Sequence, residues 1–194
     1  TNDGAVMYLD DLEDLFLEAI VFSNNRACRG GSLFIETCPD AIISNCTFKD
    51  NVAKVSGAGV FLHTGNLRLS IMDSVFVGGV VDNTGSTCEI FDTDVELYTD
   101  SGGGVALYSG NDRVSITGCT FLTLTAAYGG AVYVHQYNDK NVFSDNLFYD
   151  NLASTDGGAI FFYRLNTEAA ITDSWFNSVG AIDEAGAVYG DIMN

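Results

Sequence analysis

The sequence predicts an all-β fold, a parallel β-helix of about six to seven coils of roughly 27 residues each. One landmark is two small residues followed by a small and an aliphatic one, as in "GGAV" at 129–132. Aligned on its second position, this motif falls at Gly4, Gly31, Ala58, Gly103, Gly130, Gly158 and Gly186. Its steps are 27, 27, 45, 27, 28 and 28 residues. The steps share one period and one long interval, which indicates a tandem repeat.

A second landmark, a phenylalanine, runs in phase with the first. It occurs at Phe22, Phe48, Phe76, Phe121, Phe148 and Phe176. Its steps are 26, 28, 45, 27 and 28 residues, with the long interval in the same place. Because two independent landmarks agree, the repeat is not a chance alignment.

Each repeat is predicted to contain three short strands. In 129–155, "AVYVHQY" alternates β-branched and aromatic residues, and "VF" and "LF" follow two turns. The segment "LDDLEDLFLEAI" at 9–20 has helical leucine spacing, but its tail aligns with the strand-and-Phe part of the other repeats. We therefore predict a strand with a polar lead-in there. Such strands bury their faces only when coils stack, with equivalent residues about 4.8 Å apart.

The recurring glycines predict a tight corner with positive φ in every coil. Counting from the aligned glycine, positions +2 and +4 are expected to point inward. Position +2 holds Val6, Leu33, Val60, Val105, Val132, Ile160 and Val188. Position +4 holds Tyr8, Ile35, Leu62, Leu107, Val134 and Phe162.

Further columns are defined relative to the recurring phenylalanine. The phenylalanine and the residue five before it are expected in the core. Two residues before it we expect a small or polar ladder inside a corner, made of Cys46, Ser74, Cys119, Asn146 and Ser174. Three residues after it, Asn25, Asn51 and Asn151 are expected to form partial asparagine ladders that satisfy corner amides. The column one residue before the phenylalanine is expected to be exposed. Ice binding needs a regular array of threonines, and this column mixes Val, Thr, Leu and Trp, so ice binding is not expected.

Two of these motifs together resemble a known family. "GGSL", "GGGV", "GGAV" and "GGAI", with "FSNN" at 22–25, "FKDN" at 48–51 and "FYDN" at 148–151, are similar to the tandem repeats of chlamydial polymorphic outer-membrane proteins, which are autotransporter passengers. Similar repeats occur in extracellular pectin-lyase-like β-helix proteins. "FVGG", "FLTL" and "FNSV" depart from the pattern because they lack the Asn. The resemblance implies a surface or secreted β-helix, and with the strong preference of parallel crossovers it implies a right-handed one.

Composition limits the partners. The net charge of -18 disfavours nucleic acid and anionic membranes and favours basic partners. No apolar run reaches the roughly 20 residues of a membrane span. We expect one domain over 1–194, with an inserted loop or hairpin at 80–101, and both ends lie inside a repeat. The chain is therefore expected to be part of a longer protein or of an end-to-end assembly.

The expected binding surface is an aromatic stripe on the outside of one sheet. Strand alternation directs positions +3 and +5 outward, and aromatic residues and histidines are frequent there. The aromatic stripe comprises Phe34, Phe61, His63, Tyr108, Tyr133, His135, Phe161 and Tyr163. A contiguous exposed stripe would mark an interface with protein, with a second β-helix or with sugar. The alternative is cross-strand aromatic packing partly covered by loops, and the two histidines are not expected to bind metal.

Catalytic and metal-binding patterns are weak. A polygalacturonase-like site needs paired carboxylates with NTD, GHG and RIK elements, and only "DD" at Asp10–Asp11 matches. No cofactor is expected other than Ca²⁺, for which the candidate ligands are Asp145 and Asp173, because they share one repeat position in adjacent coils. The alternative is that both carboxylates point into water.

Cysteine and glycosylation signals are local. Pairing among Cys28, Cys38 and Cys88 is plausible in a secreted protein, whereas Cys46 and Cys119 are expected to be buried thiols. "NCT" at 45–47 is a sequon that would matter only in a eukaryotic secretory context, where Asn45 would carry the glycan.

Taken together, these patterns predict a non-enzymatic extracellular or cell-surface module, structural or adhesive, that binds a protein partner or further copies. The alternative is a β-helix that binds or cleaves polysaccharide. A cleft lined by acids with an Arg or Lys would favour the alternative.

Overall fold

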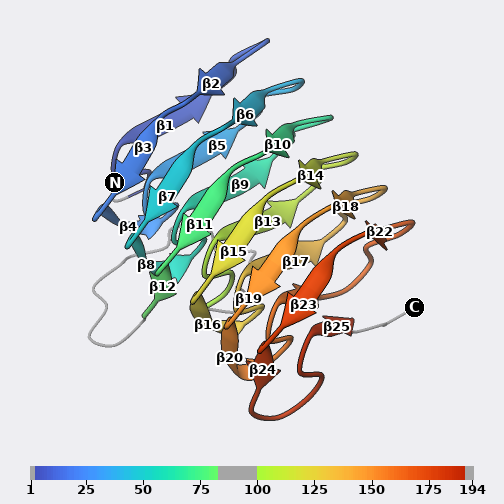
Figure 1. Ribbon diagram of the computed structural model, residues 1–194. Helices are drawn as coiled ribbons and strands as arrows, with labels where there is room; N and C mark the ends of the chain where they lie inside the picture. The colour runs from blue at the N-terminus through green and yellow to red at the C-terminus, as the bar shows by residue number, and fades with distance from the viewer. Residues whose placement is uncertain (1–2, 83–99, 191–194) are drawn as a thin grey trace.

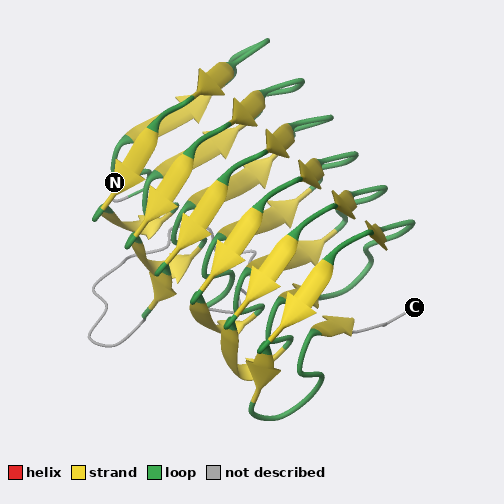
Figure 2. Ribbon diagram, viewed as in Figure 1, coloured by secondary structure: helices red, strands yellow, loops and turns green. Residues whose placement is uncertain are grey.

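The chain folds into a β-solenoid whose coils stack along one axis (Figure 1). The computed structural model describes residues 3–82 and 100–190. Within these residues there is no helix, and every paired strand is parallel to its neighbours (Figure 2). Four sheets run the length of the solenoid, so each coil contributes four short strands. The predicted parallel β-helix is confirmed, and the prediction of three strands per repeat is wrong by one.

The first sheet follows the glycine corner. Its order is β1 (Met7–Asp10), β5 (Leu33–Glu36), β9 (Val60–Thr64), β13 (Val105–Ser109), β17 (Val132–Gln136), β21 (Ile160–Phe162) and β25 (Val188–Gly190). The second sheet is β2 (Phe16–Glu18), β6 (Ile42–Ser44), β10 (Ser70–Met72), β14 (Ser115–Thr117), β18 (Val142–Ser144) and β22 (Ala170–Thr172).

The third sheet carries the recurring phenylalanine. It contains β3 (Val21–Ser23), β7 (Thr47–Lys49), β11 (Val75–Val77), β15 (Thr120–Leu122), β19 (Leu147–Tyr149) and β23 (Trp175–Asn177). The fourth sheet, which the sequence reading missed, contains β4 (Arg26–Arg29), β8 (Val52–Ser56), β12 (Val80–Val81), β16 (Thr125–Tyr128), β20 (Leu152–Asp156) and β24 (Gly180–Ala181). Segment 9–20 forms strands and turns, as predicted. β2 lies in its tail, and β3 follows directly after it.

The double glycine has a different purpose at each position. Gly129 has φ +59°, and a Cβ there would lie 2.1 Å from the carbonyl oxygen of Val132. A Cβ on Gly130 would lie 2.3 Å from the carbonyl oxygen of Gly158 in the next coil. The first glycine therefore supplies a left-handed turn, and the second allows close approach of neighbouring coils.

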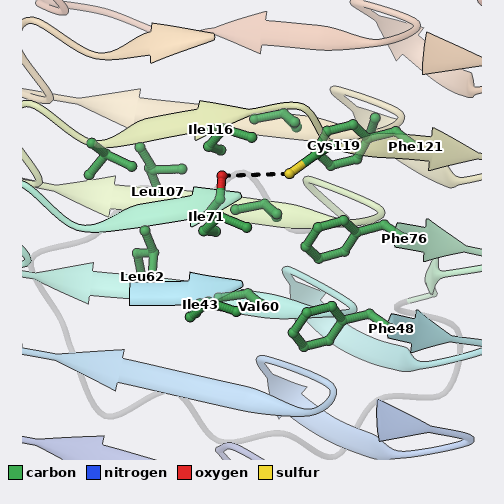
Figure 3. Packing of buried hydrophobic residues seen from close by; sticks show 14 of the residues in the cluster. Ile43, Phe48, Val60, Leu62, Ile71, Phe76, Leu107, Ile116, Cys119 and Phe121 are labelled. Carbon is green, nitrogen blue, oxygen red and sulfur yellow. Dashed lines mark hydrogen bonds between the residues drawn. The ribbon is translucent and has the colours of Figure 1, made fainter. Parts of the chain in front are cut away.

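The core lies inside the coils and is built from the predicted columns. The interior members Leu33, Val60, Leu62 and Val105 are fully buried. The recurring phenylalanines stack with ring centroids 4.6–5.0 Å apart, starting with 4.9 Å between Phe22 and Phe48 and reaching 4.6 Å between Phe48 and Phe76. Figure 3 shows part of this packing, with Phe48, Phe76 and Phe121 in one row.

The first coil corrects the alignment by one residue. Met7 and Leu9 pair with Leu33 and Ile35, so they take the inward positions. Val6 and Tyr8, predicted inward, are 47% and 52% exposed. The cause lies at Gly4. Its φ of +60° matches that of Gly30, the first glycine of its motif, so Gly4 corresponds to a first glycine and not to a second one. A one-residue shift moves every side chain of the strand to the opposite face.

Polar ladders satisfy the corners. As predicted, the Cys46 amide donates to Ser74 Oγ and the Cys119 amide to Asn146 Oδ1, at 3.1 and 2.9 Å. Burial raises the pKa of the Cys119 thiol to about 12. The Asn51 and Asn151 side chains likewise bond to neighbouring coils, with Asn51 Oδ1 accepting from the Asn25 amide at 3.0 Å.

A further asparagine ladder was not predicted. It runs through Asn66, Asn111, Asn138 and Asn166, and the first three are fully buried. Asn66 Nδ2 donates to Asn111 Oδ1 at 2.8 Å, and Asn111 Nδ2 donates to Asn138 Oδ1 at 3.1 Å. All four lie eight residues after the aligned position, a regularity that the sequence does contain.

The predicted insert at 80–101 falls mostly on residues 83–99, outside the described residues. Its flanks belong to the solenoid. Val80 and Val81 form β12, and Ser101 bridges in parallel to Ser56 and Tyr128. The coils before and after the insert are therefore joined directly in the first sheet, where β9 pairs with β13.

Candidate functional site

The structure brings the predicted aromatic stripe together on the outer face of the first sheet. Two columns of rings run parallel to the solenoid axis. In one column, Phe34 stacks on Phe61 at 5.3 Å and Tyr133 stacks on Phe161 at 5.6 Å, with Ala106 in the gap between them. In the other, His63, Tyr108, His135 and Tyr163 stack at 5.1–5.2 Å. Tyr8 and Tyr189 extend the first column at its two ends.

Six of the eight residues of the aromatic stripe are nevertheless buried, and His63 and Tyr108 are half-buried, so the prediction that the stripe is exposed is wrong. That it binds a partner stays a prediction. Phe34, Phe61, Tyr133, His135, Phe161 and Tyr163 are each 1–3% exposed. Stacking covers the ring faces, and neighbouring side chains cover part of the outside. The Arg29 guanidinium lies 5.0 Å from the Phe34 ring and 5.5 Å from the Phe61 ring. The alternative reading, cross-strand aromatic packing, describes the stripe correctly.

A hydrogen-bonded group closes the stripe at its N-terminal end. Glu36 Oε1 lies 2.8 Å from His63 Nδ1, and Tyr8 Oη donates to Glu36 Oε2 at 3.1 Å. An ionised carboxylate can only accept, so Nδ1 of His63 carries a proton. Burial and the contact with Glu36 raise the pKa of the Tyr8 hydroxyl. These bonds join three successive coils, which gives the group a structural role.

The carboxylates proposed for calcium lie on the surface. Asp145 and Asp173 lie in left-handed turns of adjacent coils, with φ of 56° and 49°, and both are exposed. Among the described residues there is no group of three or more His, Cys, Asp or Glu side chains placed to hold a metal ion. Calcium binding at Asp145 and Asp173 therefore stays a prediction.

The cysteines divide into two kinds. Cys28 is disulfide-bonded, while Cys38, Cys46 and Cys119 are free, buried thiols. Cys38 is thereby removed from the disulfide candidates, because its side chain points into the core and its Sγ lies 3.1 Å from the Glu36 carbonyl oxygen. Cys88 lies outside the described residues. Asn45 is exposed in the turn between β6 and β7, and its glycosylation stays a prediction.

A small hollow lies where the chain leaves and rejoins the solenoid. It has a volume of about 240 Å³ and is lined by Val81, Asp82, Asp100, Thr125, Ala126, Ala127 and Ser154. Two acids line it without an Arg or Lys among the described lining residues. Lys54 Nζ lies 3.7 Å from Asp82 Oδ2 at its border, so a basic group is close to these acids. Asp10–Asp11 lies in the first coil, away from the hollow, and polysaccharide cleavage stays a prediction.

The outer face of the third sheet presents side chains that the sequence reading did not single out for binding. It faces the viewer in Figure 1, over β11, β15, β19 and β23. Trp175 is 69% exposed and Tyr149 is 44% exposed, far more than any ring in the interior of the aromatic stripe. In the sequence, this surface corresponds to the residue directly before and the residue directly after each recurring phenylalanine.

One family model matches the chain. Residues 147–163 match the Chlamydia polymorphic membrane protein repeat. This segment runs from β19 through "FYDN" to "GGAI", so it carries both motifs on which the resemblance rests, and the recognition is confirmed for that repeat. No curated protein and no solved structure shows significant similarity to the chain. The matched repeat belongs to a repeat family rather than to an enzyme family, and with the solenoid it fits an extracellular β-helix module.

Within the described residues, the chain has no helix long and apolar enough to span a bilayer.

Proposed function

We propose that the chain is a non-enzymatic adhesive module, a rigid solenoid that displays a binding surface at the cell surface. The repeat match at 147–163 is the observation that carries this proposal. A solenoid suits the role because stacked coils give a long, stiff surface on which neighbouring repeats present equivalent positions.

The internal construction supports a display role. The core is continuous from coil to coil, and asparagine ladders hydrogen-bond the corners of neighbouring coils. The aromatic stripe packs neighbouring coils against one another. The outward residues of the other sheets are thus free to vary without loss of the fold. The net charge of -18 favours a basic protein partner over nucleic acid or an anionic bilayer.

Attachment of coated beads to cells tests the adhesive role. Beads carrying the folded chain are expected to attach to cultured animal cells, and soluble chain is expected to compete. Beads carrying the same chain after irreversible denaturation are the control for charge and composition. Equal attachment by folded and denatured chain, or no attachment at all, would contradict the proposal.

Surface location needs its own measurement. An antibody raised against the chain should label intact source cells without permeabilisation, and external protease should abolish the labelling. An internal protein of the same cells, probed in parallel, should stay protected. Labelling that appears only after permeabilisation would refute a cell-surface location.

A further inference from the structure

The outer face of the third sheet carries, over β11 to β23, two uncharged columns that are mostly apolar, with Thr120 and Asn177 as their polar members. The columns are in register across β11, β15, β19 and β23, without a bulge. One column includes Leu147 opposite Trp175, and the other includes Leu122 opposite Tyr149. We call this surface the apolar face, and its large residues are Val75, Val77, Leu122, Leu147, Tyr149 and Trp175.

The apolar face is open to solvent at its C-terminal end. Trp175 and Tyr149 are exposed, and the remaining apolar members are half-buried. The isolated exposed Val21, in the same column at the far end of the sheet, is flanked by polar Ser23, Thr47 and Lys49. Single exposed apolar residues are ordinary, but a contiguous group marks an interaction surface.

Charge distribution indicates which partner fits. The turns on one border of the apolar face carry Asp73, Asp145 and Asp173, and the opposite border carries Asp150, all exposed. Among the outward residues of the described strands in this sheet, Lys49 alone is charged. The surface thus has an apolar centre and an acidic rim, the arrangement of an interface core with its polar border.

We propose that the apolar face binds a basic amphipathic protein segment, with its apolar side chains on Leu147, Tyr149 and Trp175 and its Lys or Arg residues on the acidic rim. This inference rests on the proposed adhesive role and assigns it a surface. A second copy of the chain fits less well, because two molecules of charge -18 would bring acidic rims together. A basic partner would meet complementary charge instead.

Fluorescence polarisation tests the apolar contact. The probe is a labelled synthetic helix of leucine on one face and lysine on the other, with a matched peptide that has glutamate in place of lysine. The double variant Trp175→Ser with Tyr149→Ser should weaken binding of the lysine peptide about tenfold or more, the scale of losing central aromatic anchors. Val21→Ser, at an equally exposed site in the same column, should leave binding unchanged.

The charge contact is tested separately. The triple variant Asp145→Asn, Asp150→Asn and Asp173→Asn should weaken binding and reduce its dependence on salt. Asp10→Asn, Asp11→Asn and Glu13→Gln remove the same charge from the exposed tip of the first coil, away from the apolar face, and should have little effect. Equal thermal midpoints of all variants would show that the fold is retained.

Three outcomes would overturn the inference. They are unchanged binding in the aromatic double variant, equal binding of the lysine and glutamate peptides, or no binding of the lysine peptide to wild-type chain. A wild-type dimer that the double variant abolishes, seen by light scattering, would assign the face to a second copy instead. Bead attachment separates the two proposals, because attachment that survives the double variant leaves the adhesive role intact and removes this surface.

Discussion

Two aromatic columns run along this solenoid on different sides of its wall. The phenylalanine column lies inside the coils, on the third sheet, and the aromatic stripe lies outside them, on the first. Both stack at about one coil spacing, with 5.0 Å between Phe76 and Phe121 and 5.3 Å between Phe34 and Phe61. Both are buried. The pleat of a strand thus decides the side of the sheet that a residue occupies, and a residue on the outer side of the sheet can still be buried.

The two columns differ in how completely they are built. The inner column repeats one residue type without interruption, and each interior ring has a ring on both faces. The outer column that contains Phe61 is interrupted by Ala106, so Phe61 has a ring of its own column, Phe34, on one side only, and this column mixes Phe and Tyr. His63 and Tyr108 of the second outer column stack on Phe61 at the longer distances of 6.1 and 6.3 Å. The inner column should therefore contribute more to stability per ring.

The largest expected effect is at the inner column. Phe76→Ala removes a ring packed between Phe48 and Phe121 in a core that cannot collapse around the gap. We expect the free energy of unfolding to fall by about 3–5 kcal/mol. Urea denaturation followed by circular dichroism measures it.

Phe176→Ala is the matched control for Phe76→Ala. Its ring is half-buried and stacks only on Phe148, at 4.8 Å. The loss should be clearly smaller. Equal losses at the two positions would show that the column does not act through two-sided stacking.

The second prediction tests the aromatic stripe. Phe61→Ala should cost about 3 kcal/mol, the lower end of the range for a buried phenylalanine, because Ala106 leaves it without a neighbouring ring of its own column on one side. Tyr8→Ala, at the half-exposed end of the same column, should cost less. If Phe61→Ala changed stability by no more than about 0.5 kcal/mol, as a surface substitution does, the stripe would be solvent-exposed after all.

The third prediction concerns a residue that links the two sides of the wall. Asn111 Nδ2 donates to the carbonyl oxygens of Leu62, in the core, and of His63, in the stripe, at 3.3 and 2.9 Å. Asn111→Ala removes the donor to these carbonyls and one of the two acceptors of Asn66 Nδ2, so we expect a loss of about 1–3 kcal/mol. Asn177→Ala, at an exposed position, is the control, and urea midpoints of both variants at matched pH decide the case. A loss equal to that of the control would remove the ladder from the forces that hold the coils.

The sequence predicted the repeat and the inward columns, because small residues and phenylalanine recur wherever every coil makes the same contact. It missed the fourth strand because "NLAST" carries little β-branched or aromatic character. It missed the ladder of Asn66, Asn111, Asn138 and Asn166 because those residues lie in turns and because the preceding coil has Cys38 instead of an asparagine next to Asn66. The burial of Phe61 and Tyr133 could not be predicted from the sequence pattern, because it depends on which side chains pack against the outer face of the sheet.

The smallest expected effect comes from a pair with no part in either column. Arg68 Nε and Nη2 donate to Asp40 at 2.7 and 2.5 Å, and both side chains are about half exposed. This bond lowers the pKa of Asp40 below its ordinary value. A depressed carboxyl pKa adds stability above the unfolded-state pKa, about 3.9, and that stability is lost as the pH falls through the folded-state pKa. Arg68→Gln should therefore lower the urea midpoint slightly at pH 7, and the difference from wild type should shrink as the pH falls below about 4. A difference as large as that of Phe61→Ala would show that this exposed ion pair holds neighbouring coils as strongly as a buried ring does. A difference that persists at low pH would show that Arg68 stabilises the fold without its pairing to ionised Asp40.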